Sequence, residues 1–183
     1  MRIFINPGHS HGGYDPGAVN HETGMTESEV VWEIGNLLAQ YLNNVGIATE
    51  VVQSDNLYYD SHEQPCVVEE ANNGDFDYFI SIHCNSFNTK AQGTETLVYN
   101  LGTTAERLAQ CIQDQIVDTF DTVDRGVKER TDLIVLKRTD MPAVLVETAF
   151  IDNPEDMVLL RDCRDEFARA IARGVTDFIS AGE

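Results

Sequence analysis

Three residues with metal-binding or acid–base side chains each stand at the end of a short apolar run: His9, His83 and Glu147. In an open α/β sheet, strand ends at one edge converge on a shared crevice, so residues far apart in sequence can meet there. Two imidazoles and a carboxylate form a metal shell with one open position, and a second carboxylate beside it can act as a base. These residue types predict a zinc hydrolase.

The carboxylate ligand of such a shell is not fixed by the residues alone. Glu22, Glu27 and Glu29 all lie near the start of the first predicted helix. Glu29 also fits the capping-box partner of Thr26, and Glu27 in the first helical turn would interact favourably with the helix macrodipole. The choice among these glutamates therefore stays open on this argument.

Glu147 is the candidate base, because it ends the predicted strand 143–146. An unpaired carboxylate at that place is costly unless it faces a cavity or a cation. A glutamate beside a zinc-bound water can take its proton and pass it to a leaving amine. The structural alternative is an ion pair between Glu147 and a buried Arg or Lys.

Composition narrows the classes of protein. The 183 residues include 12 Lys and Arg against 31 Asp and Glu, a formal net charge of −19. This charge argues against binding to nucleic acid, where phosphate neutralisation dominates, and against adhesion to anionic membranes or wall polymers. Neither a membrane-spanning run nor a signal peptide is recognisable, so no membrane insertion is expected. The four cysteines lack a CxxC pairing, which favours reduced thiols.

Hydrophobic periodicity predicts one domain, residues 1–183, in which strands and helices alternate. The predicted strands are 2–6, 47–52, 76–82, 93–99, 133–136 and 143–146, and the predicted helices are 26–43, 61–73, 103–120 and 162–179. This alternation favours an α/β sandwich with a largely parallel sheet. The short polar loop before 93–99 leaves room for an antiparallel pair with 76–83.

Several motifs of the chain resemble those of the zinc-dependent N-acetylmuramoyl-L-alanine amidases of the amidase-3 type, and the similarity runs through essentially the whole chain. The motifs are Asn6-Pro7-Gly8-His9, Asp15-Pro16-Gly17-Ala18, Ser81-Ile82-His83-Cys84-Asn85, Asp124-Arg125-Gly126-Val127-Lys128, Val135-Leu136-Lys137, Met141-Pro142-Ala143-Val144-Leu145-Val146-Glu147 and Phe150-Ile151-Asp152-Asn153. Each motif is weak alone, but their order and spacing together are specific.

The resemblance implies a three-layer α/β/α sandwich with about six strands and one catalytic Zn²⁺. It places the metal ligands on His9, Glu27 and His83 and the catalytic role on Glu147; Glu27 is selected by the helix register of Gly24-Met25-Thr26-Glu27. The implied reaction is hydrolysis of the amide between N-acetylmuramic acid and L-alanine in peptidoglycan, as in autolysins and endolysins. The expected partner is peptidoglycan or a muropeptide, and a monomer is expected.

The chain departs from the family pattern near the site. Ser10 and His11 displace the usual glycine pair, so His11 competes as a ligand. Gln53 stands in place of a typical arginine, and Ala149 in place of a glycine. Two polar residues, Asn85 and Thr148, are candidates for positions near the site.

Three other functions were weighed against the amidase. A zinc peptidase would use the same ligands with a subsite for a peptide terminus. A cysteine hydrolase would use Cys84 beside His83, but adjacent strand residues point to opposite faces. A non-catalytic wall-binding module would not need Glu147. Action at the cell wall is expected, by phage release, in a mother cell or as a domain of a longer exported protein.

Overall fold

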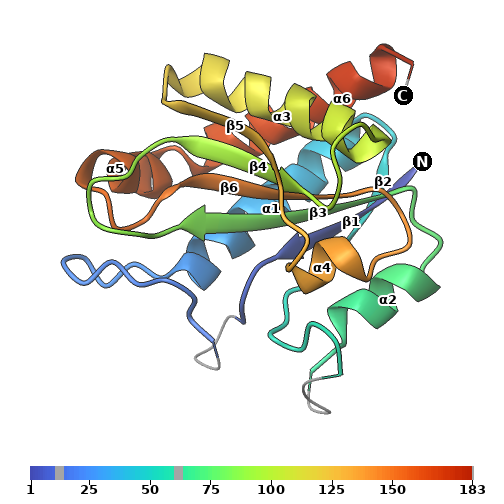
Figure 1. Ribbon diagram of the computed structural model, residues 1–183, viewed down its shortest axis with the longest axis horizontal. Helices are drawn as coiled ribbons and strands as arrows, with labels where there is room; N and C mark the ends of the chain where they lie inside the picture. Colours follow the sequence, from blue (N-terminus) through green and yellow to red (C-terminus); the bar gives the residue numbers. More distant parts are fainter. Residues whose placement is uncertain (11–14, 60–63, 183) are drawn as a thin grey trace.

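The computed structural model describes residues 1–10, 15–59 and 64–182. Its strands form one six-stranded sheet in the order β2-β1-β3-β6-β4-β5 (Figure 1). The strands are β1 (Arg2–Pro7), β2 (Ala48–Val51), β3 (Tyr78–Asn85), β4 (Thr94–Val98), β5 (Asp124–Glu129) and β6 (Ala143–Phe150). The helices are α1 (Glu27–Asn44), α2 (Val67–Asn73), α3 (Thr104–Phe120), α4 (Ile134–Lys137), α5 (Pro154–Asp162) and α6 (Arg164–Ser180).

Strand direction brings several segments to one edge of the sheet. β1, β3 and β6 run parallel and end together, while β4 is antiparallel to β6 and begins at that edge. Glu147 of β6 pairs with His83 of β3 on one side and with Glu95 of β4 on the other. These three residues therefore form a row across neighbouring strands.

Helices cover both faces of the sheet, with α1, α3 and α6 on one face and α2 and α4 on the other (Figure 1). Side-chain alternation divides the core accordingly: Ile3 and Ile5 pack in the larger cluster, and Phe4 packs between the sheet and α2. By the same alternation Leu145 belongs to the α2 and α4 face, so Glu147 lies on that face further along β6. The predicted three-layer, mostly parallel sandwich is confirmed.

The two predicted capped helix starts are present. Thr26 Oγ1 accepts a hydrogen bond from the Glu29 backbone N–H, and Thr103 Oγ1 accepts one from that of Glu106, each at 3.4 Å. Such caps satisfy backbone donors that the first helical turn leaves free. The first cap makes Glu27 the opening residue of α1.

One predicted strand and the expected partner of another were wrong. Residues 133–136 were predicted as a strand, but Ile134–Lys137 form α4, with Leu133 as the N-cap. Val135 and Leu136 pack in the smaller core cluster. A short apolar run has no periodicity long enough to separate a strand from a helical turn. The strand predicted at 93–99 exists as β4, but its antiparallel partner is β6 rather than β3, because β6 inserts between them.

Other element boundaries also needed correction. The helix predicted over 61–73 begins at Val67 in the described residues. The C-terminal helix is preceded by a separate helix, α5, which starts at the N-cap Asn153 and Pro154. β5 was not predicted as a strand, because its sequence is mostly charged. No helix in the described ranges is long and apolar enough to span a membrane.

Candidate metal centre and catalytic site

His9, Glu27 and His83 come together at the edge where β1 and β3 end. Each offers a ligand atom, and these atoms all lie within 4.8 Å of one another. Glu27 lies between the histidines: its Oε2 is 3.0 Å from His9 Nε2 and its Oε1 is 2.9 Å from His83 Nδ1. A loop, a helix start and a strand thus supply one residue each. His11 lies outside the described residues.

Backbone N–H groups fix the carboxylate of Glu27. Cys84 donates to Oε1 and Ala18 donates to Oε2, each at 2.9 Å. Glu27 is buried, with 3% of its surface exposed. Because both oxygens are already held, the carboxylate has a single orientation, with its oxygens directed at the two imidazoles.

Two glycines give the histidines and the glutamate their space. A Cβ at Gly8 would lie 2.2 Å from His83 Cε1, and a Cβ at Gly17 would lie 2.6 Å from Glu27 Oε2. Gly17 also has φ +66°, a conformation that side chains other than glycine rarely adopt. The two glycines of the sequence motifs are therefore steric requirements of the site.

Asp15 orients His9 and was given no role from the sequence. Its Oδ2 lies 2.8 Å from His9 Nδ1, and its Oδ1 accepts a hydrogen bond from the Gly17 N–H at 3.0 Å. With Nδ1 engaged, His9 directs Nε2 toward Glu27. The signal was present in Asp15-Pro16-Gly17, where an Asp two residues before a glycine is typical of a turn.

Gln53, which replaces the arginine of the family pattern, links two segments that carry candidate metal ligands. Its side-chain amide donates to the backbone oxygen of Gly8 at 3.0 Å and to that of Ser28 at 2.9 Å. One amide group thus links the loop that carries His9 to the first turn of α1. Ala149, the other departure, is buried in the larger core cluster.

The close contacts among His9, Glu27, His83 and Asp15 shift the pKa values of His9 and Glu27. Burial lowers the pKa of His9, but hydrogen bonds and charges from Glu27 and Asp15 outweigh burial and raise that pKa to about 9. Burial raises the pKa of Glu27, but His83 and His9 outweigh it and hold that pKa well below its usual range. The two imidazoles therefore favour the charged form of the Glu27 carboxylate.

Glu147 has a different environment from Glu27. It is paired with His83 in the β3–β6 register, and its Oε2 is buried without a hydrogen-bond partner. Burial, with the nearby charges of Glu27 and Glu95, raises its pKa to about 7 despite the opposing charge of His83. Among the described residues Glu147 forms no ion pair with an Arg or Lys. The ion pair that was considered as its alternative role is therefore absent from this part of the chain.

A polar cluster on β4 and β5 borders Glu147. Glu95 Oε2 accepts hydrogen bonds from Arg125 Nε at 2.7 Å and Lys128 Nζ at 2.5 Å, and Glu95 Oε1 accepts one from Asn85 Nδ2 at 3.0 Å. Asn85, a predicted near-site residue, therefore contacts Glu95. Sequence reasoning missed Glu95, because its partners come from strands that only the fold brings together.

Cys84 and Thr148 are buried next to the backbone of His83. Cys84 is 3% exposed in the larger core cluster, and burial raises the pKa of its thiol well above the usual value. Thr148 Oγ1 donates to the His83 backbone oxygen at 2.9 Å and lies 3.5 Å from Cys84 Sγ. A buried, protonated thiol is a poor nucleophile.

The residues present fit a zinc ion. Two imidazoles and one carboxylate are a donor set of catalytic zinc sites, which leave a further position for water or substrate. The unpartnered Glu147 Oε2 beside them is a buried oxygen that has no role in a closed structural site. The group could therefore hold a metal ion with a base next to it.

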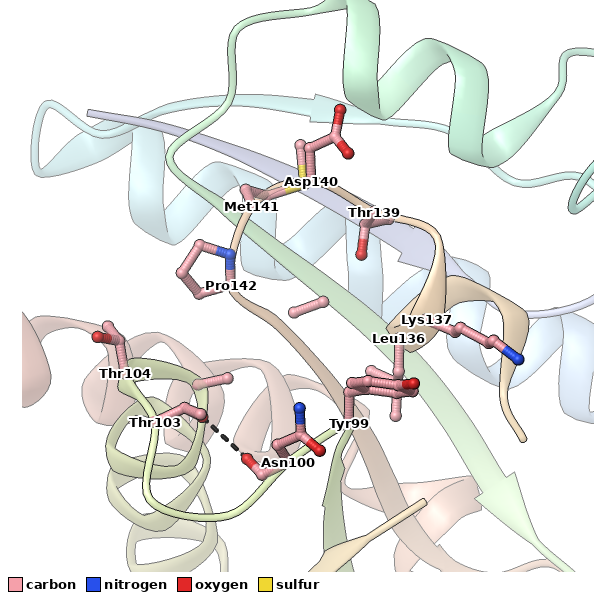
Figure 2. Close-up of a pocket in the computed structure, with 12 residues that line it drawn as sticks. Tyr99, Asn100, Thr103, Thr104, Leu136, Lys137, Thr139, Asp140, Met141 and Pro142 are labelled. Atoms are coloured by element: carbon pink, nitrogen blue, oxygen red, sulfur yellow. Dashed lines mark hydrogen bonds between the residues drawn. The ribbon is translucent and has the colours of Figure 1, made fainter. Parts of the chain in front are cut away.

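The sheet has a separate cavity at the other end of β6. Figure 2 shows this pocket, of about 360 Å³, with Tyr99, Leu136 and Pro142 among the residues that line it. Pro142 directly precedes β6, whereas Glu147 lies in the second half of the strand. None of His9, Glu27, His83 or Glu147 lines this pocket.

Comparisons with known proteins agree with this geometry. The sequence pattern of the N-acetylmuramoyl-L-alanine amidases matches residues 3–177. The amidase LytC of Bacillus subtilis is 34% identical over 181 residues, which cover 96% of this chain and 35% of LytC. The sporulation-specific N-acetylmuramoyl-L-alanine amidase of the same organism is 32% identical over 177 residues, which cover 95% of this chain and 65% of that protein.

A solved structure of the CwlD amidase of Clostridioides difficile, in complex with the GerS lipoprotein, has a TM-score of 0.86 at 27% identity and covers 98% of both chains. The present chain spans only about a third of LytC and about two thirds of the sporulation-specific relative. Fold, motif order and the matched range lead to one conclusion: this chain belongs to the N-acetylmuramoyl-L-alanine amidase family.

Proposed function

We propose that residues 1–183 act as one catalytic domain that hydrolyses the amide between N-acetylmuramic acid and L-alanine in peptidoglycan with the help of one Zn²⁺. The observation that carries the proposal is the buried, unpartnered carboxylate oxygen of Glu147 next to the His9, Glu27 and His83 group. The family relationship supplies the substrate class.

His9, Glu27 and His83 would hold the zinc ion. When bound, zinc supplies a Lewis acid and lowers the pKa of water toward neutrality. The chain prepares these ligands in advance: Asp15 orients His9, two backbone N–H groups fix Glu27, and Thr148 holds the backbone of His83. Pre-oriented ligands lose little freedom on binding, which favours affinity.

Glu147 would carry the proton during hydrolysis. A carboxyl group whose pKa is about 7 exchanges protons readily near neutral pH. We infer that Glu147 takes a proton from the attacking water and then gives it to the departing alanine nitrogen. The C–N bond breaks, the carbonyl carbon gains the water oxygen, and a free amino terminus leaves.

The rival functions have weaker support. A zinc peptidase would share the metal group, but the family match favours the muramoyl amide. A cysteine hydrolase conflicts with the burial of Cys84. A non-catalytic wall-binding module gives no reason for a buried Glu147 whose oxygen lacks a partner. Action at the cell wall follows from the proposed substrate, and the predicted monomer stays a prediction that sedimentation can test.

Digestion of purified peptidoglycan, followed by mass spectrometry, tests the proposal. We expect free stem peptides with an amino-terminal alanine, lost with a zinc chelator and restored by Zn²⁺. Glu147→Gln should keep a full equivalent of zinc but lose at least about 10²-fold in turnover, the usual contribution of a general base. Glu50→Gln, at an exposed glutamate of β2, is the control.

Other outcomes would point elsewhere. Cleavage within the stem peptide would make the chain a zinc peptidase. An active Glu147→Gln enzyme would remove Glu147 from the catalytic role. Binding without any product would leave a wall-binding module.

A further inference from the structure

The loop over residues 86–93 lies at the end of the sheet where β1, β3 and β6 terminate, which is the end that carries the candidate metal group. It connects the end of β3 to the start of β4, and because β6 lies between these two strands, the loop crosses over the end of β6 (Figure 1). Phe87, near its start, is 78% exposed, more than Val45 at 61% or Tyr59 at 58%. A largely exposed aromatic ring therefore stands on the loop that follows the strand of His83.

The backbone around Phe87 is fixed by a carboxylate from the next strand end. Asp152 Oδ2 accepts hydrogen bonds from the N–H groups of Phe87 at 3.1 Å and Thr89 at 2.8 Å. Asn88 Oδ1 accepts two more, from Lys90 at 3.1 Å and Ala91 at 2.9 Å. The loop thus presents the ring from a backbone held at four N–H groups.

The Cα atom of Phe87 lies close to that of His83, a candidate metal ligand. It follows His83 by four residues, and an extended chain spans about 3.3–3.6 Å per residue, so their Cα atoms are at most about 14 Å apart. A polymer that places one bond at His83 and Glu147 and runs toward this loop would reach it within a few sugar rings.

The character of the loop indicates the kind of ligand. Its sequence, Ser-Phe-Asn-Thr-Lys-Ala-Gln-Gly, has no acidic residue in a chain that has 31. Sugar rings have an apolar C–H face, which packs on an aromatic ring, and hydroxyl and acetamido groups, which hydrogen-bond to neutral polar side chains. Phe87 beside Ser86 and Asn88 offers both kinds of contact.

We propose that Phe87, with the polar side chains of its loop, forms a subsite for a sugar ring of the glycan strand, next to the sugar that carries the scissile amide. Asp152 is the positioning residue that fixes the loop. This inference rests on the proposed function, because it takes peptidoglycan as the substrate. The proposed subsite predicts that the enzyme binds the glycan strand as well as the stem peptide.

Binding of glycan strands without stem peptides tests the subsite separately from catalysis. We expect Phe87→Ala to weaken their Kd, measured by isothermal titration, by at least about fivefold, the loss expected for one aromatic contact. Phe87→Trp should keep the affinity. Leu101→Ala, at a 48% exposed residue of the loop after β4 at the opposite edge, should leave it unchanged.

Kinetics on two substrates complete the test. On intact peptidoglycan Phe87→Ala should raise KM at least about fivefold with little change in kcat, whereas on a muramoyl peptide with a single sugar both constants should match those of the wild type. Glycan affinity independent of Phe87 would overturn the subsite and leave the ring as a contact for another protein. An equal loss on the single-sugar substrate would also overturn it, since the loop would then serve only the fold. If the wild type binds glycan through Phe87 but releases no alanine peptide, the proposed function fails while the subsite stands.

Discussion

A histidine that binds a metal needs its other ring nitrogen held, and Asp15 provides this contact for His9. The distance of 2.8 Å between Asp15 Oδ2 and His9 Nδ1 is that of a charge-assisted hydrogen bond. Such a partner fixes the orientation of the ring and increases the basicity of the coordinating nitrogen. Asp15 would therefore act on a bound metal through His9.

Asp15→Ala should weaken zinc binding by about 10–100-fold, the usual loss when a partner of a metal-ligating histidine is removed. Competition with a coloured chelator would measure the affinity. Asp118→Ala, at an exposed position on α3, is the matched control. Unchanged zinc affinity in Asp15→Ala would show that the hydrogen bond does not support the metal group.

Glu95 contributes to the stability of the fold in a way that depends on pH. Burial raises its pKa, but hydrogen bonds from Lys128 and Arg125 outweigh burial and lower it. A carboxyl group whose folded pKa is below its unfolded value stabilises the fold above the unfolded pKa, and this stabilisation is lost as the pH falls through the folded pKa.

Glu95→Gln should therefore lower the free energy of unfolding near pH 7 by about 1–2 kcal/mol, a value reduced by the partial exposure of both cations. The difference from the wild type should shrink as the pH falls below about 4.5. Urea unfolding between pH 3.5 and 7 measures it. A difference in the free energy of unfolding that does not change with pH would contradict the ion-pair explanation.

The sequence pointed to the site residues unevenly. His9, His83 and Glu147 could be chosen because each follows an apolar strand, and strand ends converge. Glu27 needed the family resemblance, since its neighbours Glu22 and Glu29 offer the same chemistry. Contacts such as that between Glu95 and Lys128 join segments that are 33 residues apart, and no local pattern reports them.

Among the elements, the helix pair α3 and α6 depends on a single glycine. A Cβ at Gly174 of α6 would lie 2.5 Å from Ile112 Cα and 2.8 Å from the Cys111 backbone oxygen of α3. The neighbours are backbone atoms, which cannot move aside as a flexible side chain can. The two helices therefore pack at a distance that only glycine permits.

Gly174→Ala should lower the free energy of unfolding by about 1–3 kcal/mol, the usual cost of overpacking. Helix propensity alone predicts the opposite sign, a gain of about 1 kcal/mol, so the sign decides between packing and propensity. Thermal unfolding would show a decrease of about 2–4 °C per kcal/mol for a chain of this size. Glu166→Ala, at an exposed site of α6, is the control, and a stabilised Gly174→Ala would contradict the close packing.

Prediction of the elements succeeded where patterns were long. α1 and α3 combine a capping threonine with a long apolar stripe, and both were predicted near their observed ends. β5 was not predicted as a strand, because this edge strand, Asp-Arg-Gly-Val-Lys-Glu, has a single large apolar residue. The β4 partner could not be inferred, since insertion of β6 between β3 and β4 is a property of the topology.

For the molecule as a whole, the dominant electrostatic fact is the formal net charge of −19. Local ion pairs, such as those of Glu95, engage only part of the acidic side chains. The remaining negative charges repel one another across the surface, and self-repulsion destabilises the compact state more than the expanded chain. Salt screens this repulsion, because the Debye length decreases from about 30 Å at 0.01 M to about 8 Å at 0.15 M.

Stability at pH 8 should therefore rise with sodium chloride, by about 1 kcal/mol or about 2–4 °C in Tm between 0.01 M and 0.15 M. The same titration at pH 5, near the sequence pI of about 4.4, should show a smaller slope, because fewer carboxylates are charged there. Scanning calorimetry at both pH values measures the two slopes. Equal slopes would mean that salt acts through general solvation rather than charge, and a falling Tm at pH 8 would mean that the ion pairs lost to screening outweigh the repulsion it relieves.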